Sequence, residues 1–591
     1  MSGRARAAQA AAWLSGLSVL WAVAITFAGG LTFRLGALRV SSNNPENPLL
    51  LALAAGWGAW TLATPAQRGR LRGFVASVAS APTALAPVVA ALAAAATVAI
   101  GITQGASYVG SADSYGYVSQ ADLWAHGTLT YREPLAREFD WPFAGRALAP
   151  LAYLPMDDGE TMAPVYAPGL PLAMAAFQVV AGRAAVFLVV PILSGLAILA
   201  TYWMGARLVD RTVGAAAAVL LATSPAFLFH VLDMPMSDAP ATAWWALALS
   251  LGLVNQRGAA FGAGLAAGAA TATRPNLVPL VLFVAAPILY DVVRDRTNRR
   301  RAIARLAWLS LGAMPGLVIV AVVNDSLFGS PFLSGQLLVN PPFSAAHVAA
   351  NLWRYSTWLF QTQTPAVLAA LAAPFLLTRA AEATKPRGRT RAVALAWLGL
   401  VGAVLASYLF FIPSDHWVWL RYLLPAFPAL FVLTAAALAA GFARYGRDIR
   451  VVGLAVFVGV LALRGAAFAR GEGVFSLEEG QQRFRAVGEF VAADLPDRAV
   501  FISVVHGGNI RYYAARPTVR YDMIPPPELD RVVADLRSRG YRPYAVLDVW
   551  EETLFRRTFE GHSRLAALDW APVAAFGRGP EVRVYDLDVG R

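Results

Sequence analysis

The chain has 591 residues, of which 57% are hydrophobic and only 14% are charged. Soluble domains carry about 25% charged residues, so this composition excludes a soluble enzyme. The 17 Trp, 18 Tyr and 30 Phe exclude a disordered or fibrous chain, and the absence of cysteine excludes disulfides and thiolate chemistry. The formal charge of +13 comes from an arginine-rich composition, from which we infer no nucleic-acid partner. A polytopic α-helical membrane protein is expected.

A helix needs about 20 apolar residues to cross about 30 Å of hydrocarbon. Thirteen segments fit that description: 13–33, 48–63, 83–103, 184–206, 213–231, 238–254, 258–273, 276–290, 306–324, 364–378, 392–412, 417–442 and 451–465. The first lacks a convincing small-x-small cleavage site, so it is interpreted as a retained anchor and not as a signal peptide. We therefore expect about 13 transmembrane helices.

One further apolar stretch, 166–181, decides the orientation of the chain. If it does not cross the membrane, the arginine-rich segments, including the run 294–305, lie on the cytoplasmic side together with the N-terminus, as the positive-inside rule favours. Pro164, Pro168 and Pro171 also suit a bent helix at the outer membrane surface. We expect an interfacial helix there, and three outward pieces: the loop 104–182, the loop 325–363 and everything after residue 464.

The C-terminal region differs in composition from the rest. Charged residues return, and strand-like runs (500–504, 545–549, 582–585) alternate with amphipathic helical stretches (482–494, 528–539). We expect three parts: two extra N-terminal transmembrane helices in 1–82, a transmembrane module in 83–465 with the outer loop 104–182, and a small extracytoplasmic α/β domain in 466–591.

Asp113 follows the third span, with Tyr115 and Tyr117 close behind it. A carboxylate at that place, partly shielded from water, could act as a general base. The alternative, which spacing alone favours, is that Asp113 is the N-cap of a surface helix beginning at Ser114.

Asp238 lies in a short outward turn and opens the sixth span. The helix dipole stabilises a negative charge there, and a structural cap is again the alternative. Two acidic turns on one side of the membrane could nevertheless converge on a single site.

Two arginines lie at the same boundary. Arg274 follows the seventh span, and Arg421 lies just inside the twelfth. Arginine at that depth is unfavourable in lipid unless it is paired or reaches the headgroups. Each either anchors its helix or, as a pair, the two hold a membrane-embedded phosphate.

Metal binding is left open. Asp157, Asp158 and Glu160 could bind a divalent cation, but a solvated turn is favoured, and the six histidines lack metal-ligand spacing. No cofactor is expected with certainty beyond this open divalent metal ion.

Taken together, these residues resemble the GT-C glycosyltransferases, the group of protein O-mannosyltransferases and lipid A aminoarabinose transferases. The resemblance covers about residues 83–465. It rests on motifs that occur in family order: Asp113 to Tyr117, the proline-rich Tyr166 to Pro171, Met236 to Pro240, Thr273 to Asn276, Phe328 to Pro331 and Arg421 to Pro425.

The resemblance implies a polyprenyl-phosphate sugar donor, a glycan, lipid or protein acceptor, and transfer at the outer face of the cell (inner or plasma) membrane. It implies Asp113 as the base, Asp238 as the residue that orients the acceptor or a metal, and Arg274 and Arg421 as phosphate ligands. Further substrate contacts are expected from Tyr115, Tyr117, Tyr166 and Asn276. The chemistry agrees, because an inverting displacement of a phosphate needs one base for the acceptor and cations for the leaving group.

Two features depart from the family pattern. Two spans precede the one that leads into Asp113, whereas relatives usually place that loop after the first span, and Ala167 stands where some relatives carry a lysine beside the prolines. A secondary transporter of an anionic solute and a lipid-linked glycan ligase remain alternatives. A transporter would show repeated halves and helices broken at mid-membrane. A non-catalytic scaffold would leave Asp113 and Asp238 far apart.

Overall fold

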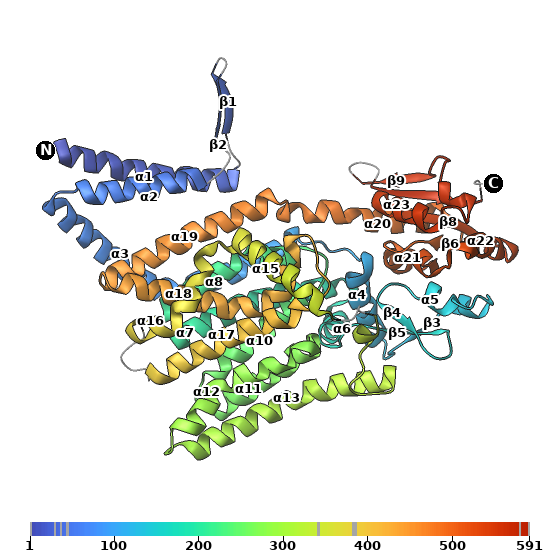
Figure 1. Cartoon of the computed structure of the whole chain (residues 1–591), viewed down its shortest axis with the longest axis horizontal. Coiled ribbons are helices and arrows are strands. Elements are labelled where there is room, and N and C mark those ends of the chain that lie inside the picture. The colour runs from blue at the N-terminus through green and yellow to red at the C-terminus, as the bar shows by residue number, and fades with distance from the viewer. Residues whose placement is uncertain are drawn as a thin grey trace.

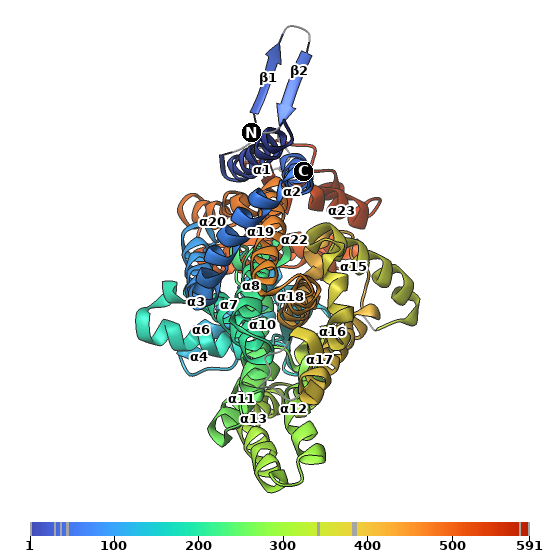
Figure 2. The ribbon, with the colours of Figure 1, turned by 90° about the vertical axis from the view of Figure 1, so that its left-hand side faces the viewer.

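The computed structural model describes residues 3–28, 31–35, 38–42, 46–339, 343–380, 387–577 and 581–588. An elongated bundle of helices carries a small sheet-containing region at one end (Figure 1). Seen from the opposite end, α8 (Arg211–Ala222), α10 (Asp238–Gly252) and α18 (Phe427–Ala443) occupy the middle of the bundle (Figure 2). At one edge lie α1 (Gly3–Ala28) and α2 (Glu46–Leu62), and at the other lie α11 (Arg257–Thr273), α12 (Val281–Arg294) and α13 (Arg299–Phe328).

Among the described residues, eight helices are long and apolar enough to cross a membrane, or up to ten if each of two bent pairs is one span. The eight lie in α1 (Gly3–Ala28), α3 (Pro65–Gln104), η2 with α7 (Arg183–Leu208), η3 with α12 (Pro275–Arg294), α13 (Arg299–Phe328), α17 (Arg387–Leu409), η6 with α18 (Trp417–Ala443) and α19 (Arg447–Gly471). The bent pairs are α8 (Arg211–Ala222) with α9 (Pro225–Leu232), at 58°, and Ala345–Gln363, which contains α15 (Val348–Gln363), with Pro365–Leu377, at 102°. The chain is a multi-pass membrane protein.

Three further expected spans are also helices, but short ones. They are α2 (Glu46–Leu62), α10 (Asp238–Gly252) and α11 (Arg257–Thr273), which have 17, 15 and 17 residues. Each falls below the length of about 20 residues that crosses the hydrocarbon. By length and composition the described residues support eight to ten membrane helices, and the exact count of thirteen stays a prediction.

The segment between α3 and α7 folds into short elements. It contains α4 (Ser111–Ala125), a three-stranded antiparallel sheet in the order β3-β5-β4 (Tyr131–Arg132, Thr161–Pro164, Tyr153–Pro155), and α6 (Gly169–Ala181). The apolar stretch expected from residue 166 becomes helical only at Gly169, after Pro168, and its 13 residues are too few to cross a bilayer.

After α19 the chain forms a five-stranded sheet in the order β7-β6-β8-β10-β9. The strands are β6 (Ala499–Ile502), β7 (Thr518–Val519), β8 (Arg542–Asp548), β9 (Ala574–Phe576) and β10 (Val582–Asp586), with β6 parallel to β7 and β8, and β10 antiparallel to β8 and β9. The helices are α20 (Leu477–Asp494), α21 (Gly507–Ala514), α22 (Leu529–Ser538) and α23 (Val549–Phe559).

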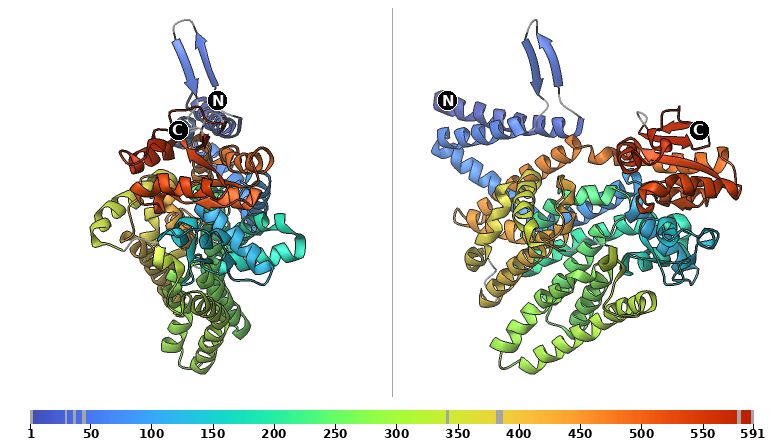
Figure 3. Two further views of the ribbon diagram at one scale, coloured as in Figure 1. Left: turned by 90° about the vertical axis from the view of Figure 1, so that its right-hand side faces the viewer. Right: turned by 45° about the vertical axis from the view of Figure 1, so that its right-hand side comes forward.

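This α/β region shares a hydrophobic core with the loop between α3 and α6. One hydrophobic cluster contains Val500 of the sheet, Val532 of α22, and four residues of the loop: Leu135, Phe139, Trp141 and Leu148. Trp141 also donates a hydrogen bond from its indole Nε1 to Asp535, at 2.8 Å. The two regions lie side by side at the same end of the molecule (Figure 3), so they form one body.

Candidate active site

The helix that carries Asp113 begins earlier than its spacing suggests. Gly110 is the N-cap of α4, in extended conformation, and its N–H donates to the Ser114 hydroxyl at 3.0 Å. Asp113 therefore lies inside the first turn, and the interpretation of Asp113 as the N-cap of a helix beginning at Ser114 is wrong. Its side chain is left available for other partners.

Asp238 is likewise more than a helix cap. Ser237 is the N-cap of α10, no side-chain capping bond forms, and the Asp238 side chain is fully buried. One of its oxygens, Oδ1, accepts hydrogen bonds from both Arg274 and Arg421, the latter from Nε at 3.1 Å. A carboxylate held by two arginines is a charge centre and not a lone structural cap.

Arg421 joins the two carboxylates. Its Nη2 donates to Asp113 Oδ2 at 3.0 Å, while its Nε donates to Asp238. Asp113, Asp238, Arg274 and Arg421, which we call the Asp–Arg cluster, come from α4, the start of α10, the end of α11 and the 3₁₀ helix η6 (Trp417–Ala426). Four chain segments that are distant in sequence thus meet in one place.

Burial within the Asp–Arg cluster is graded. The exposed fraction of the side chain is 0% for Asp238, 8% for Arg274, 13% for Arg421 and 28% for Asp113. The outermost group is therefore Asp113, and the deepest is the pair of Arg274 with Asp238. Removing one partner of such a buried ion pair destabilises the folded protein by about 3–5 kcal/mol, because the other charge is left buried without a partner.

Two tyrosines cover Asp113. The Tyr166 hydroxyl donates to Asp113 Oδ1, and the Tyr166 ring stacks on Tyr117 with centroids 4.6 Å apart. A Cβ at Gly116 would overlap the Tyr166 ring, so glycine is required for this approach. Burial, and then the charge of Asp113, hold the pKa of Tyr166 well above its ordinary value. The hydroxyl therefore stays protonated and remains a donor at neutral pH.

The inner end of the site is lined by Ser237, Asn276 and Tyr408. Ser237 Oγ accepts from the Tyr117 hydroxyl at 2.9 Å and from Arg274 Nε at 3.3 Å. The Tyr408 hydroxyl accepts from Asn276 Nδ2 at 3.0 Å and from Arg274 Nη1 at 3.4 Å. The expected contact residue Asn276 thus supports Arg274 through a shared tyrosine.

Tyr408 and Tyr422 were not anticipated as part of this site. Their rings stack with centroids 4.7 Å apart, and the guanidinium carbon of Arg421 lies 5.7 Å from the Tyr422 centroid. The available signal was a tyrosine near the end of an apolar span, because a buried phenol needs a hydrogen-bond partner.

Tyr115, expected as a substrate contact, lies outside the Asp–Arg cluster. It is two residues beyond Asp113 on α4 and so faces another direction, toward α21, where a Cβ at Gly508 would overlap its ring. Its ring centroid is 5.9 Å from that of Tyr153. Tyr115 is a packing residue between α4 and the C-terminal region.

The C-terminal region holds the loop around α4 by polar contacts as well. Val109 N–H donates to the Tyr513 hydroxyl at 3.0 Å. Arg511 donates to the Leu148 carbonyl at 2.8 Å and pairs with Glu133, which is almost fully buried. The position of Asp113 therefore depends on residues that lie some 400 positions later in the sequence.

Arg511→Leu is expected to destabilise this assembly by about 3–5 kcal/mol, because it leaves the Glu133 carboxylate buried without its partner. Thermal unfolding and the rate of proteolysis within residues 131–164 measure the effect. Arg498→Leu is the control, since that arginine is exposed, donates to the Arg539 carbonyl and lies over the Tyr541 ring, and a change within about 0.5 kcal/mol is expected. Equal stability of both variants would contradict the clamping role of Arg511.

The acidic turn before β5 uses its carboxylates locally. Asp158 accepts from the backbone N–H groups of Glu160 at 3.0 Å and of Thr161 at 2.8 Å, and Glu160 pairs with Arg137. Across the residues that the structure describes, no group of three or more His, Asp or Glu side chains is arranged to hold a metal ion.

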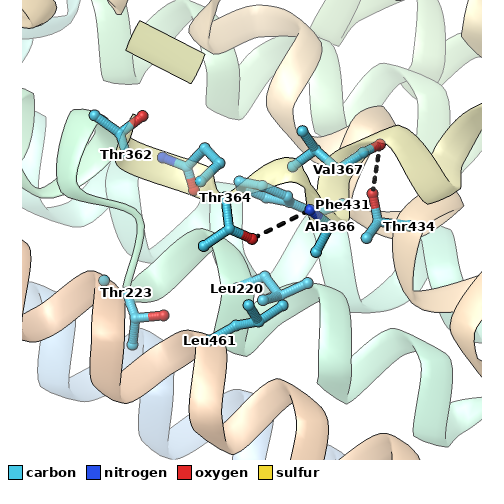
Figure 4. A pocket seen from close by; sticks show the side chains of 11 residues that line it. Leu220, Thr223, Thr362, Thr364, Ala366, Val367, Phe431, Thr434 and Leu461 are labelled. Atoms are coloured by element: carbon cyan, nitrogen blue, oxygen red, sulfur yellow. Dashed lines mark hydrogen bonds between the residues drawn. The ribbon is translucent and has the colours of Figure 1, made fainter. Parts of the chain in front are cut away.

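A small cavity of about 10 Å³ lies elsewhere in the bundle, beside the bend between α15 and η5 (Pro365–Ala372). Thr364 caps η5 by accepting from the Ala366 N–H, and Thr434 donates to the Val367 carbonyl across it (Figure 4). Its volume accommodates one water molecule and no sugar. None of its lining residues belongs to the Asp–Arg cluster, so it is not part of the candidate site.

No protein-family model and no curated protein sequence matches the chain. Solved structures do match. ArnT from Cupriavidus metallidurans in the apo state is 14% identical, with 84% of this chain and 97% of that chain covered and a TM-score of 0.53. The same protein bound to undecaprenyl phosphate is 15% identical, with the same coverage and a TM-score of 0.51. The oligosaccharyltransferase AglB from Archaeoglobus fulgidus, in complex with an inhibitory peptide and a dolichol-phosphate, is 13% identical, with 84% and 74% covered and a TM-score of 0.54.

These similarities show the fold of the chain. It has the fold of ArnT and AglB, which are GT-C glycosyltransferases, as the resemblance in its sequence predicts. The likeness extends over more of the chain than the residues that suggested it, because 84% of the sequence is covered.

Proposed function

We propose that the chain is a membrane glycosyltransferase that moves a sugar from a polyprenyl-phosphate donor to an acceptor hydroxyl at the extracytoplasmic face. The observation that carries this proposal is the Asp–Arg cluster, in which Arg421 links Asp113 to the pair of Asp238 and Arg274. The fold supports it, since the solved relatives with this fold include one bound to undecaprenyl phosphate and one with a dolichol-phosphate.

The proposed reaction is a single displacement with inversion. Asp113 takes the proton from the acceptor hydroxyl as its oxygen attacks the anomeric carbon. The bond between that carbon and the phosphate oxygen breaks, and polyprenyl phosphate leaves with both electrons of the bond. Arg274 and Arg421 neutralise the leaving phosphate, which therefore needs no general acid.

In this proposal Asp238 has an electrostatic role. Its Oδ1 accepts from both arginines and so fixes the guanidinium groups at one place, while its buried Oδ2 accepts no hydrogen bond from the described residues. Tyr166 is partly exposed beside Asp113 and is backed by the buried ring of Tyr117, so it offers an aromatic surface suited to the face of a sugar ring.

We further propose that the N-terminus is cytoplasmic in a plasma or inner membrane with thirteen spans, and that residues 466–591 are extracytoplasmic. With that orientation, the Asp–Arg cluster opens to the outer leaflet. The donor lipid then enters from the membrane, and the acceptor, a glycan, lipid or protein, reaches Asp113 from the aqueous side.

Transfer of a complete lipid-linked glycan is the second candidate. The observation that favours it is the fold shared with AglB, an oligosaccharyltransferase. A monosaccharide donor on a single phosphate and an oligosaccharide donor distinguish the two functions when each is supplied separately.

The test is incubation of the purified protein in lipid bilayers with a set of labelled polyprenyl-phosphate sugars. Release of polyprenyl phosphate in the presence of acceptor is expected from at least one donor. Protein carrying Asp113→Asn serves as the matched control. If no sugar leaves any lipid donor, and the protein instead moves an anionic solute across the bilayer, the chain is a transporter.

A further inference from the structure

Both oxygens of the base proposed for sugar transfer hold a hydrogen-bond partner in this structure. Asp113 Oδ1 accepts from the Tyr166 hydroxyl, and Asp113 Oδ2 accepts from Arg421 Nη2 at 3.0 Å. A carboxylate that is to take a proton from an acceptor must have an oxygen within hydrogen-bond reach of that hydroxyl. An acceptor hydroxyl therefore competes with the present partners for Asp113, and the structure indicates which of them can give way.

The charges of the Asp–Arg cluster balance without substrate. Two carboxylates face two guanidinium groups, so an arriving phosphate brings excess negative charge into a mostly buried site. That charge is stabilised only if an arginine turns toward the phosphate. Since both arginines are already paired, an arriving phosphate competes with the two carboxylates for them.

Arg274 is poorly placed for that exchange. It is buried at the deep end of the cluster and donates to Asp238, Ser237 and Tyr408 with its three nitrogens. Moving it would leave Asp238 short of a partner in the interior, which is strongly unfavourable.

Arg421 is the arginine that can turn. Its side chain is more exposed than that of Arg274, and within the described part of the chain no hydrogen bond uses its Nη1. Arg421 contacts Asp238 through Nε and Asp113 through Nη2. A rotation of the guanidinium group that keeps the hydrogen bond to Asp238 can therefore break the hydrogen bond to Asp113.

The backbone that carries Arg421 is also unusual. η6 is a 3₁₀ helix of ten residues, Trp417–Ala426, directly before α18. Runs of 3₁₀ helix longer than three or four residues are uncommon, and such a stretch within a span often marks a hinge. A small change in the winding of η6 would shift Arg421 relative to Asp113 on α4.

We propose that the donor phosphate unmasks the catalytic base. This inference rests on the function proposed above. In this structure Arg421 is paired with Asp113. When a polyprenyl phosphate binds, its phosphate oxygens take over the Nη groups of Arg421, while Nε keeps its bond to Asp238. Asp113 is then released for the acceptor, so the base becomes available only when a donor is seated.

The test measures how readily Asp113 reacts with a water-soluble carbodiimide and an amine, by mass spectrometry of the intact, lipid-embedded protein after digestion. Three additions are compared: undecaprenyl phosphate, undecaprenol without the phosphate, and inorganic phosphate. Undecaprenyl phosphate is expected to raise the labelling of Asp113 several-fold, and undecaprenol is expected to leave it unchanged. A rise with inorganic phosphate alone would assign the effect to the phosphate group without its lipid.

Asp122 is the matched internal control. It lies on the same helix, its side chain is 34% exposed against 28% for Asp113, and its partners Gln178 and Arg183 are not in the Asp–Arg cluster. Its labelling should be the same in all three additions. Any parallel change at Asp122 would mean that the lipid alters α4 as a whole, which would overturn the proposal.

Two variants distinguish the release of Asp113 by Arg421 from a general effect on the fold. Arg421→Ala should label Asp113 strongly with or without undecaprenyl phosphate. Tyr166→Phe keeps Arg421, so the response to undecaprenyl phosphate should persist. Asp113 labelling in the unaltered protein could stay constant or fall on addition of undecaprenyl phosphate while sugar transfer proceeds. In that case the proposed release of Asp113 by the donor phosphate is wrong, and the proposed function stands. If sugar transfer is also absent, the proposed function fails as well.

Discussion

Asp113→Asn is expected to lower the rate constant for sugar transfer by about 10²–10⁴-fold, the usual contribution of a general base. The asparagine oxygen can still accept from the Tyr166 hydroxyl, and Asp113 is the most exposed member of the Asp–Arg cluster, so the fold should persist. Release of polyprenyl phosphate from a labelled donor measures the rate, and thermal unfolding measures the fold.

The control for this variant is Asp122→Asn on the same helix. Asp122 pairs with Gln178 at 2.7 Å and lies near Arg183, away from the Asp–Arg cluster. It should retain most of the activity. Full activity of Asp113→Asn would remove Asp113 from the reaction, whatever the effect of the control.

Arg274→Ala is expected to weaken the binding of polyprenyl phosphate by about 10- to 150-fold, which corresponds to about 1.5–3 kcal/mol for a hydrogen bond to a charged group. The side chain is buried at the deep end of the Asp–Arg cluster, where water competes little for the phosphate. Equilibrium binding of a labelled polyprenyl phosphate to protein in nanodiscs gives the dissociation constant directly.

Loss of Arg274 also leaves Asp238 with one arginine, so stability must be measured beside affinity. Arg274→Lys keeps the charge and should recover stability better than phosphate binding, because a lysine offers a point charge in place of the planar fork. Arg207→Ala controls for the loss of a partly buried arginine. Arg207 lies near the C-terminal end of α7, donates to the Ser250 carbonyl and is not a member of the Asp–Arg cluster. Unchanged donor affinity in Arg274→Ala would reduce Arg274 to a structural residue.

The sequence was sufficient to predict that the charged residues meet. Arginine and aspartate at span boundaries are unfavourable in lipid unless paired, and their common side of the membrane follows from the order of the spans. Asp113, Asp238, Arg274 and Arg421 do lie together. Which groups pair was not predictable, because the bridge by Arg421 depends on how four distant segments pack.

Other features lay beyond local patterns. The direction of Tyr115 depends on where α4 begins, and Gly110 moves that start three residues ahead of the expected one. Tyr408 enters the site through the packing of α17 against η6, which no periodicity encodes. The strands β7 and β9 have two and three residues, too few for an alternating pattern.

The shared core of the outer loop and the C-terminal sheet has a consequence for biosynthesis. Leu135, Phe139 and Trp141 leave the ribosome hundreds of residues before Val500 and the rest of their partner sheet. At synthesis rates of about 5–20 residues per second, these apolar side chains wait on the order of tens of seconds without the surface that covers them. During that interval the nascent chain is exposed to aggregation and to proteases. The segment after α19 therefore completes the core of the outer loop, and a chain terminated before residue 466 would lack the surface that covers Leu135, Phe139 and Trp141.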